Sequence, residues 1–354
     1  MKLGVLTGGG DAPGLNAVLR AVVRTAVTRY RSDVVGISRG FEGLLRPPEF
    51  WPLSPADVQG LIRRGGTILG CNRSNPFDLD GRDRSREIVD SIRWLGIEAL
   101  IVIGGEGSLT IAKRLADQGV PVIGVPKTVE NDLPGTDVTF GYATAIELAT
   151  SAIDMLQTTG ETDYRVMYLE VTGRQAGWIA LNAGISGGAD VVLVPEVPYD
   201  PEHVAGVIAR RKGEGKSTTV VVVAEGAREE GGVPPERLPR EGVAARVASR
   251  VNMVSHEDFR VTVLGHLQRG GDPNPHDRLI ATRFGASAVR AAHEKDFGRM
   301  VGIQGGETVL VPLDDVVGRV KTIDVQSELV WTATSVGMSL GQPLERLSAA
   351  AAAP

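Results

Sequence analysis

The sequence contains little cysteine, no excess of basic residues and no long apolar run, and each shortage excludes a class of protein. Cys71 is the only cysteine among 354 residues, so an intrachain disulfide and a CxxC metal site are excluded. Asp and Glu number 43 against 38 for Lys and Arg, whereas nucleic-acid-binding proteins carry a basic excess. No segment approaches the roughly 18 apolar residues of a membrane span, and the first residues lack the apolar core of a secretory signal. We therefore expect a cytoplasmic protein that binds neither nucleic acid nor membranes.

Short apolar runs alternate with amphipathic stretches along the chain. Leu15–Tyr30 is predicted to be a helix because Val18, Val22 and Ala26 recur at helical spacing. Further helices are predicted at Leu109–Gln118 and Ile146–Leu156. Strands are predicted at Leu3–Thr7, Val34–Ile37, Ala99–Ile103, Pro121–Val125, Arg165–Val171, Val191–Val194, Thr219–Ala224 and Val261–Leu264. This alternation predicts an α/β fold with a mostly parallel sheet that is covered on both faces.

Three loops rich in glycine or acidic residues directly follow predicted strands, at residues 8–11, 104–108 and 126–132. Ligands of open parallel sheets bind beyond the carboxyl ends of the strands. The first two loops, GGGD and GGEGS, precede helices, where glycine allows close approach to an anion and free N–H groups can bind phosphate. Tight turns without a ligand are the alternative. Neither loop has the GxGxxG spacing of a dinucleotide site, which disfavours a dehydrogenase.

Glu106 lies within the second of these loops. A carboxylate repels phosphate unless a cation lies between them, and Mg²⁺ commonly takes one or two carboxylates together with phosphate oxygens. The sequence therefore predicts that Glu106 is a ligand of phosphate-bound Mg²⁺.

The third loop carries Glu130 and Asp132 close to Lys127 and Thr128. A carboxylate at the end of a strand suits a general base for a substrate hydroxyl. A solvated charged turn without catalytic function is the alternative.

Basic residues later in the chain lie at the ends of predicted strands. Arg165 is the first residue of the strand predicted at Arg165–Val171, and Arg174 follows that strand. Arg260 directly precedes the strand predicted at Val261–Leu264, and His266 and Arg269 follow it. Because the planar guanidinium binds phosphate through two parallel hydrogen bonds, these arginines suggest phosphate capture. For His266 a purely structural role is the alternative.

Five segments, taken in their order and spacing, resemble those of 6-phosphofructokinases. They are GVLTGGGDAPGLN, IGGEGS, PKTVENDLPGTD, EVTGRQAGW and VLGHLQRGG. The resemblance runs from Leu3 to about Arg283, which is nearly the whole chain. One such loop would be weak evidence, whereas five in register identify the family strongly.

The resemblance implies two similar Rossmann-like α/β/α domains with mostly parallel sheets and an active site between them. Residues 1–138 with about 256–305 would form the nucleotide-binding domain, and about 139–255 with 306–345 the sugar-phosphate-binding domain. Residues 346–354 would be a flexible tail. The resemblance also implies a homotetramer in which arginines reach into a neighbouring subunit's site.

The activity that the resemblance implies is that of an ATP-dependent 6-phosphofructokinase. Such an enzyme transfers the γ-phosphoryl group of Mg-ATP to the 1-hydroxyl of fructose 6-phosphate, a reaction of glycolysis. The nucleotide phosphates would then be held by Gly9, Arg73, Ser74, Gly105, Gly107 and Ser108, with Glu106 as the Mg²⁺ ligand.

The same resemblance assigns residues to the sugar. Thr128, Glu130 and Asp132 would face its reacting end, with Glu130 as the base and with Thr128 and Arg174 also catalytic. Further contacts to the sugar would come from Thr172, Gly173, Arg174 and Glu225, and contacts to its 6-phosphate from His266, Arg269 and the adjacent subunit's Arg165 and Arg260.

Three positions depart from the family's usual residues. Glu130 and Glu106 replace the more usual Asp, and Thr172 replaces the usual Met. One added methylene moves a carboxylate by about 1.5 Å, and such a displacement can cost on the order of a hundredfold in rate. Another acceptor, such as a seven-carbon sugar phosphate, therefore stays open, as does a weakly catalytic protein that senses nucleotides or sugar phosphates.

Two positions bear on the choice of phosphoryl donor, and they favour different donors. Gly107 matches the ATP-dependent members, and Lys127 matches the pyrophosphate-dependent members. A side chain at position 107 would exclude the nucleotide sterically, whereas the extra positive charge of Lys127 does not exclude it. We therefore give Gly107 more weight and expect ATP as the donor. Pyrophosphate is the alternative.

Overall fold

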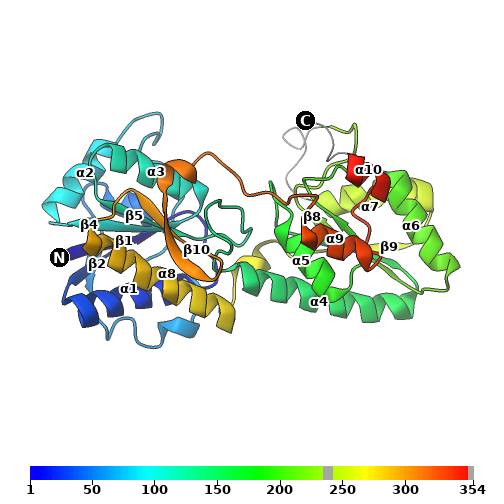
Figure 1. Cartoon of the computed structure of the whole chain (residues 1–354), viewed down its shortest axis with the longest axis horizontal. Helices are drawn as coiled ribbons and strands as arrows, with labels where there is room; N and C mark the ends of the chain where they lie inside the picture. The colour runs from blue at the N-terminus through cyan, green and yellow to red at the C-terminus, as the bar shows by residue number, and fades with distance from the viewer. Residues whose placement is uncertain (234–241, 350–354) are drawn as a thin grey trace. The chain divides into compact units, whose positions relative to one another are not determined.

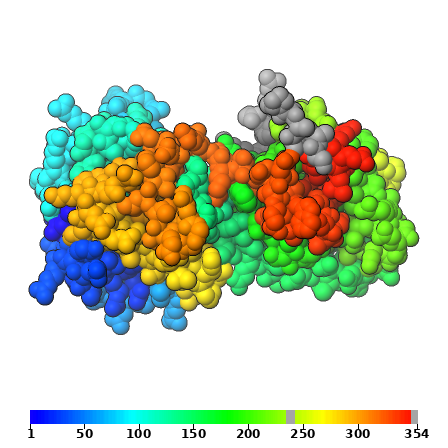
Figure 2. Space-filling model, viewed as in Figure 1, coloured from blue at the N-terminus to red at the C-terminus, as the bar shows by residue number. Residues whose placement is uncertain are grey.

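The computed structural model describes residues 1–233 and 242–349, which form two compact units (Figure 1). Unit 1 comprises Met1–Val129, Leu133–Thr144 and Arg269–Arg319. Unit 2 comprises Glu130–Asp132, Ala145–Gln268 and the chain from Val320 on. In Figure 2 the blue surface of the N-terminal residues and the orange surface of the segment before Arg319 both belong to unit 1.

Unit 1 is built on a seven-stranded sheet with the strand order β11-β10-β5-β4-β1-β2-β3. Its strands are β1 (Lys2–Thr7), β2 (Asp33–Ile37), β3 (Phe50–Leu53), β4 (Ala99–Gly104), β5 (Val122–Pro126), β10 (Arg299–Gln304) and β11 (Glu307–Pro312). The five strands from β10 to β2 are mutually parallel. The outer strands β3 and β11 are antiparallel to their neighbours.

Helices cover both faces of this sheet, as its continuous apolar strands require. Val5 points into the core beneath α1 (Leu15–Tyr30) and α8 (Pro275–Glu294). Leu6, the next residue, points into the opposite core beneath α2 (Ser85–Trp94) and α3 (Glu106–Asp117). Three short 3₁₀ helices complete unit 1: η1 (Gly40–Leu44), η2 (Leu61–Arg63) and η5 (Leu313–Asp315).

Unit 2 contains a four-stranded, fully parallel sheet with the order β7-β8-β6-β9. The strands are β6 (Val166–Val171), β7 (Val191–Leu193), β8 (Thr219–Ala224) and β9 (Phe259–Val263). The central strands β6 and β8 are entirely buried, whereas β9 is a partly exposed edge strand. The helices are α4 (Tyr142–Asp163), α5 (Trp178–Gly187), α6 (Pro201–Gly213), α7 (Val243–Ser255), α9 (Glu328–Ser335) and α10 (Leu344–Ala349), with the 3₁₀ helix η4 at Gly265–Arg269.

The predicted fold class is confirmed, and all eight predicted strands are present with their ends within two residues. The prediction did not include β3, β10 and β11. The helix predicted at Leu109–Gln118 in fact begins at Glu106, and the one predicted at Ile146–Leu156 extends over Tyr142–Asp163. The early start of α3 matters because it makes Glu106 the first residue of a helix.

The boundaries between the units follow strand pairing. The expected division placed 256–305 with the first domain and 306–345 with the second. In the structure β9 pairs with β6 in unit 2, and β11 pairs with β10 in unit 1. The chain therefore passes into unit 1 at Arg269 and leaves it after Arg319.

The C-terminal segment is helical as far as Ala349. Of the tail expected at 346–354, residues 346–349 belong to α10, and residues 350–354 lie outside the described part of the chain. Among residues 1–233 and 242–349, no helix is long and apolar enough to span a membrane.

Candidate active site

The three predicted loops follow three neighbouring strands of unit 1. β5, β4 and β1 are adjacent and parallel, so their carboxyl ends lie at one edge of the sheet. The edge brings together the glycine loop after Thr7, the Gly105 loop after β4 and Lys127 after β5. The Gly8 amide donates to the Ile103 carbonyl at 2.8 Å, which ties the first loop to the end of β4. This edge is the position at which open parallel sheets bind ligands.

Glycine at two positions allows helix α3 to approach the sheet closely. A Cβ at Gly8 would lie 2.5 Å from the Ser108 hydroxyl, and one at Gly104 would lie 2.3 Å from the Ser108 Cβ. Both distances are too short for real Cβ contacts. Gly9 has a φ of +79°, and its amide donates to the Asn72 carbonyl at 2.9 Å. Ser108, predicted to hold phosphate, is thus buried against the glycines.

A cavity of about 600 Å³ opens beside the glycine loop. It brings together Gly9 and Arg73, two of the predicted phosphate-binding residues. Its other lining residues are Gly10, Asp11, Gly66, Thr67, Cys71 and Asn72. Arg73 is exposed, so its guanidinium can reach a bound anion.

Ser74, predicted to hold phosphate, is hydrogen-bonded within its own turn. Its amide and its hydroxyl both donate to the Asn72 Oδ1 atom at 2.6 Å. The Asn72 amide in turn donates to Glu42. The hydrogen bonds of Ser74 therefore shape the turn that carries Arg73.

Lys127 is a buried cation at the same edge. Only 4% of its surface is exposed, and its ammonium donates to the Gly10 carbonyl. Burial lowers the pKa of Lys127 to about 8; Cys71 and Asp11 oppose the shift, whereas Arg269 and Arg73 add to it. Arg269, assigned to unit 1, donates to the Asp11 carbonyl at 3.3 Å. Positive charge is therefore concentrated around the glycine loop.

Glu106 is exposed at the start of α3, directly after Gly105. Its Oε1 atom accepts from the Thr110 hydroxyl at 2.8 Å and from the Gly318 amide at 3.4 Å. In the described part of the chain, no group of three or more His, Cys, Asp or Glu side chains could hold a metal ion. A single oriented carboxylate fits Mg²⁺ held together with substrate phosphates, and does not fit an all-protein metal cage.

The third loop continues from unit 1 into unit 2. Thr128 still belongs to unit 1, whereas Glu130–Asp132 belong to unit 2. The Glu130 Oε2 atom accepts from the Arg174 amide at 3.3 Å. Asn131 has a φ of +52°, a left-handed conformation that asparagine tolerates better than most residues. Lys321 holds this loop: its ammonium donates to Asn131 at 3.1 Å, and its amide donates to the Asp132 carbonyl at 2.8 Å.

The predicted sugar-binding residues of unit 2 lie at the carboxyl ends of its strands. Thr172, Gly173 and Arg174 follow β6, and Glu225 follows β8. The Glu225 amide donates to the Val171 carbonyl at 2.9 Å, which ties the two strand ends together. Gln268 adds a further tie, because its Oε1 atom accepts from the Thr172 amide at 2.7 Å and the residue is only 1% exposed.

Arg165 and Arg260 lie at the other end of the same sheet. Arg165 immediately precedes β6 and pairs with Asp163 at 2.6 Å, and Arg260 is near the start of the parallel strand β9. At about 3.3 Å per residue, β6 separates Arg165 from Thr172 by roughly 20 Å. One chain therefore does not bring these two arginines to the residues that follow β6.

His266 and Arg269 occupy the first and last part of η4. His266 is exposed and belongs to unit 2, whereas Arg269 belongs to unit 1. Both residues follow β9 at its carboxyl end, as the sequence predicted.

The sequence did not predict Gln268 and Lys321, which position the loops of the site through hydrogen bonds. Gln268 lies inside the quoted segment VLGHLQRGG, so its position between His266 and Arg269 was a usable signal. Lys321 lies far from every motif, and no pattern in the sequence indicated its contact with residues 131–132.

Comparison with known proteins agrees with this arrangement. A family model described as phosphofructokinase matches residues 2–292. The chain belongs to the phosphofructokinase family. The "ATP-dependent 6-phosphofructokinase" of Chloroflexus aurantiacus is 48% identical over 353 residues, which cover 97% of this chain and 98% of that protein. The resemblance read from the five segments, and the enzyme class that it implied, are confirmed.

Other phosphofructokinases are similar in sequence or structure. The "Pyrophosphate--fructose 6-phosphate 1-phosphotransferase" of Streptomyces coelicolor is also 48% identical, over 92% of this chain and 96% of its own length. The solved phosphofructokinase of Saccharomyces cerevisiae superposes with a TM-score of 0.79 at 34% identity, over 89% of this chain and 45% of that longer chain. A solved pyrophosphate-dependent phosphofructokinase of Marinobacter aquaeolei has a TM-score of 0.80 at 26% identity, over 98% and 91% of the two chains. Overall identity therefore does not discriminate between the two donors.

Proposed function

We propose that this member of the phosphofructokinase family transfers the γ-phosphoryl group of Mg-ATP to the 1-hydroxyl of fructose 6-phosphate. The observation that carries the choice of donor is Gly107, in the first turn of α3. A Cβ at this position would meet no atom within 4 Å, so the space beside the helix start is open. An aspartate there, as in the pyrophosphate-dependent members, would fill this space and repel the nucleotide's phosphates.

The residues of unit 1 suit the binding of a polyphosphate. Gly9 and Arg73 line the cavity beside the glycine loop, and the free amides at the start of α3 follow Gly105. Ser108 allows the helix to pack closely beneath them, and Ser74 orients the turn that carries Arg73. We assign the nucleotide phosphates to these residues.

Glu106 is the residue proposed to hold Mg²⁺. Its carboxylate is exposed and oriented by Thr110, and it begins the helix whose amides bind phosphate. When bound, Mg²⁺ offsets the negative charge of the phosphates that approach each other during transfer.

Most of the residues proposed to bind and activate the sugar phosphate belong to unit 2, whereas Thr128 and Arg269 belong to unit 1. Glu130 takes the proton of the attacking hydroxyl, and the Arg174 amide orients its carboxylate. Thr128 and Asp132 flank Glu130 in the chain, and the guanidinium of Arg174 stabilises negative charge on the transferred group. The sugar and its 6-phosphate are assigned to Thr172, Gly173, Arg174, Glu225, His266 and Arg269.

Arg165 and Arg260 are proposed to bind the 6-phosphate of a neighbouring subunit's substrate. Their place at the amino-terminal ends of β6 and β9 supports this, because it separates them from their own chain's Thr172 and Glu225. The proposal requires a homo-oligomer, which we take to be a homotetramer.

One assay tests the proposed reaction. The full chain is incubated with fructose 6-phosphate and Mg²⁺, in parallel with ATP and with pyrophosphate, and fructose 1,6-bisphosphate is measured. We expect product with ATP. Tight binding of fructose 6-phosphate without turnover by either donor would replace the enzyme with a sugar-phosphate sensor, and turnover of only a seven-carbon sugar phosphate would change the acceptor.

Lys127 supports pyrophosphate as a second candidate donor. Its buried ammonium adds positive charge beside Gly9 and Gly10, where a compact polyanion such as pyrophosphate would benefit from it. Faster turnover with pyrophosphate than with ATP in the same assay would favour this candidate.

A further inference from the structure

The loop that carries Glu130 is held by a residue from a distant part of the chain. Lys321 lies between η5 and α9, 190 residues after Asn131, and both residues belong to unit 2. The Lys321 ammonium donates to the Asn131 Oδ1 atom at 3.1 Å, and the Lys321 amide donates to the Asp132 carbonyl at 2.8 Å. One residue therefore holds both a side chain and the backbone of the loop.

Asn131 depends on this support because of its backbone conformation. Its φ of +52° lies in the left-handed region, which costs free energy for any residue with a Cβ and persists where surrounding contacts enforce it. The residue is only 4% exposed, so water would poorly replace a lost hydrogen bond from Lys321. Because Glu130 directly precedes Asn131, the turn at Asn131 determines where the Glu130 side chain is directed.

Lys321 is in turn fixed by its neighbours in unit 2. The Trp178 indole N–H donates to the Lys321 carbonyl at 2.7 Å, and the ammonium lies 5.7 Å from the centre of the Trp178 ring. Two residues further on, the Ile323 amide donates to the Glu196 carboxylate at 2.9 Å. A lysine side chain loses considerable rotamer freedom when it is held in one place, and these contacts order Lys321 before it reaches Asn131.

The same contacts lead back to the Glu130 carboxylate. Glu196 also accepts from the Gly177 amide at 3.1 Å, and Gly177 is three residues after Arg174. The Arg174 amide donates to the Glu130 Oε2 atom at 3.3 Å. The turn after Glu130 is therefore held through Lys321 and its carboxylate through Arg174, and Glu196 connects the two supports. We call this set of contacts the frame of Glu130.

We propose that Lys321 is a positioning residue for phosphoryl transfer. It holds residues 131–132 so that the Glu130 carboxylate keeps the orientation in which it takes the proton of the sugar hydroxyl. This inference rests on the proposed function, in which Glu130 is the base. A displacement of about 1 Å can cost on the order of a hundredfold in rate, so the loss of such a support lowers kcat.

Lys321→Met tests this role and leaves the backbone amide of residue 321 in place to bind Asp132. We expect kcat to fall about tenfold, with the KM values for fructose 6-phosphate and ATP within about twofold of the wild-type values. Lys321→Arg keeps a donor for Asn131 and should retain at least about half of the wild-type kcat. A kcat of Lys321→Met within about twofold of wild type, or an effect on KM alone, would refute the positioning role.

Asn131→Gly removes the acceptor of the lysine hydrogen bond and keeps the left-handed turn, because glycine adopts a positive φ without strain. If Lys321 acts through Asn131, adding Lys321→Met to Asn131→Gly lowers kcat by less than about twofold. A further tenfold loss in the double variant would show that Lys321 acts through another group.

A double-mutant cycle with Glu130→Gln separates positioning from a direct effect of charge. Once residue 130 cannot take a proton, its orientation no longer limits the rate, so adding Lys321→Met should cost less than about twofold in kcat. A full tenfold loss in this background would contradict the proposal. It would mean that the Lys321 ammonium acts on the transferred group itself, or that its loss damages unit 2 as a whole.

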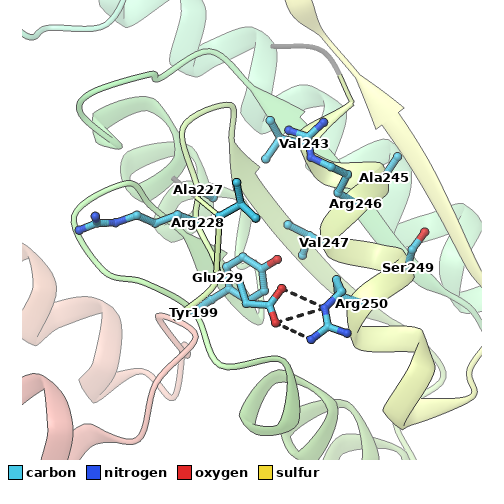
Figure 3. A pocket seen from close by; sticks show the side chains of 11 residues that line it. Tyr199, Ala227, Arg228, Glu229, Val243, Ala245, Arg246, Val247, Ser249 and Arg250 are labelled. Carbon is cyan, nitrogen blue, oxygen red and sulfur yellow. Dashed lines mark hydrogen bonds and ion pairs between the residues drawn. The ribbon is translucent and has the colours of Figure 1, made fainter. Parts of the chain in front are cut away.

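A matched control shows whether the loss is specific to the frame. Arg250 on α7 forms an ion pair with Glu229 through contacts of 2.5 to 3.1 Å, beside a cavity of unit 2 (Figure 3). Arg250→Met removes one cation and its contacts, as Lys321→Met does, but it removes no contact of the frame. We expect its kcat to stay within about twofold of wild type, and an equal loss in both variants would refute a specific role of Lys321.

The same assays distinguish failure of this inference from failure of the proposed function. If the wild-type chain does not turn over fructose 6-phosphate, or if Glu130→Gln keeps full activity, the proposed function or its base is wrong, and the positioning role falls with it. If Glu130→Gln loses activity while Lys321→Met keeps it, only the role of Lys321 is refuted. Circular dichroism of each variant confirms that the chain is folded.

Discussion

Glu130 combines an unusual residue type with a defined hydrogen bond. The family's usual aspartate is one methylene shorter, and the Glu130 carboxylate accepts from the Arg174 amide at 3.3 Å. The contact gives the longer side chain a fixed orientation, which a general base needs.

Replacing Glu130 by glutamine tests this role. Glu130→Gln keeps the size and the hydrogen-bond acceptor but cannot take a proton, so we expect kcat to fall about a hundredfold to ten-thousandfold. Glu130→Asp should keep more activity than Glu130→Gln because it keeps the carboxylate. Steady-state kinetics with a circular dichroism check of folding measures both. Near-full activity of Glu130→Gln would show that another group takes the proton.

Lys127 predicts a pH dependence in phosphoryl-donor binding. Burial lowers the pKa of Lys127 to about 8, so its positive charge is present below this pH and is lost above it. We expect kcat/KM for ATP to fall as the pH rises through about 8, because the phosphates lose a nearby cation. Lys127→Met should lack this step, and the same step in that variant would assign the titration to another group.

The stability of the folded chain should change in the opposite direction over the same range. Between the folded pKa of about 8 and the unfolded value of 10.5, the unfolded chain binds a proton that the folded chain does not. The free energy of unfolding therefore rises with pH in this interval, since stability increases wherever the unfolded state binds more protons. Urea unfolding of the wild-type chain and of Lys127→Met at several pH values isolates this contribution.

At the scale of elements, the junction of β1, β4 and α3 depends on close packing. Ser108 in the first turn of α3 fits against Gly8 and Gly104, where no Cβ can be placed without a shift. This packing brings the start of the helix, with its free amides, to the edge where the strands end.

Two glycines of this junction should respond differently to substitution by alanine. Gly104→Ala would place a Cβ 2.3 Å from the Ser108 Cβ, and we expect a loss of about 1–3 kcal/mol in the free energy of unfolding. Gly107→Ala meets nothing within 4 Å and should leave the stability unchanged or slightly raised, since alanine favours helix. Denaturant unfolding compares them, and equal stabilities would mean that the junction is not tightly packed.

The sequence predicted best those strands whose side chains are buried on both faces of a sheet. β4 and β8 are buried on both faces, so their continuous apolar runs were recognisable. β3 contains a proline and β11 has mixed polarity, because both are outer antiparallel strands with partly exposed side chains. The start of α3 was predicted three residues too late because Gly105 and Gly107 flank Glu106, and glycine disfavours helix.

The sequence predicted those site residues whose type and position at strand ends indicate a chemical role. Glycines, carboxylates and arginines at strand ends have a recognisable chemistry, and the structure brings Gly9 and Arg73 to one cavity. Lys321 and Gln268 act through hydrogen bonds to the backbone, at Asp132 and Thr172. Such contacts depend on tertiary structure and leave no pattern in the sequence.

At the scale of the whole molecule, the position of Arg260 predicts how active sites are assembled. If Arg260 serves a neighbouring subunit, a mixture of inactive Arg260→Gln and Glu130→Gln chains forms some sites that have both wild-type residues. We expect such mixtures, unfolded and refolded together, to regain part of the activity that each variant lacks alone. No recovery in mixed oligomers, verified by differently tagged chains, would mean that Arg260 acts within its own chain or not at all.

The discontinuity of unit 1 has a consequence for biosynthesis. Helix α1 is complete at Tyr30, but its packing partner α8 begins only at Pro275. At about 5–20 residues per second, a ribosome delivers that partner tens of seconds after α1 emerges. During this delay the strands of the sheet can cover one side of α1, but the apolar residues that face α8 stay uncovered. The nascent chain should therefore depend on chaperones that bind early in translation, and slow codons placed before residue 275 should lower the yield of folded protein.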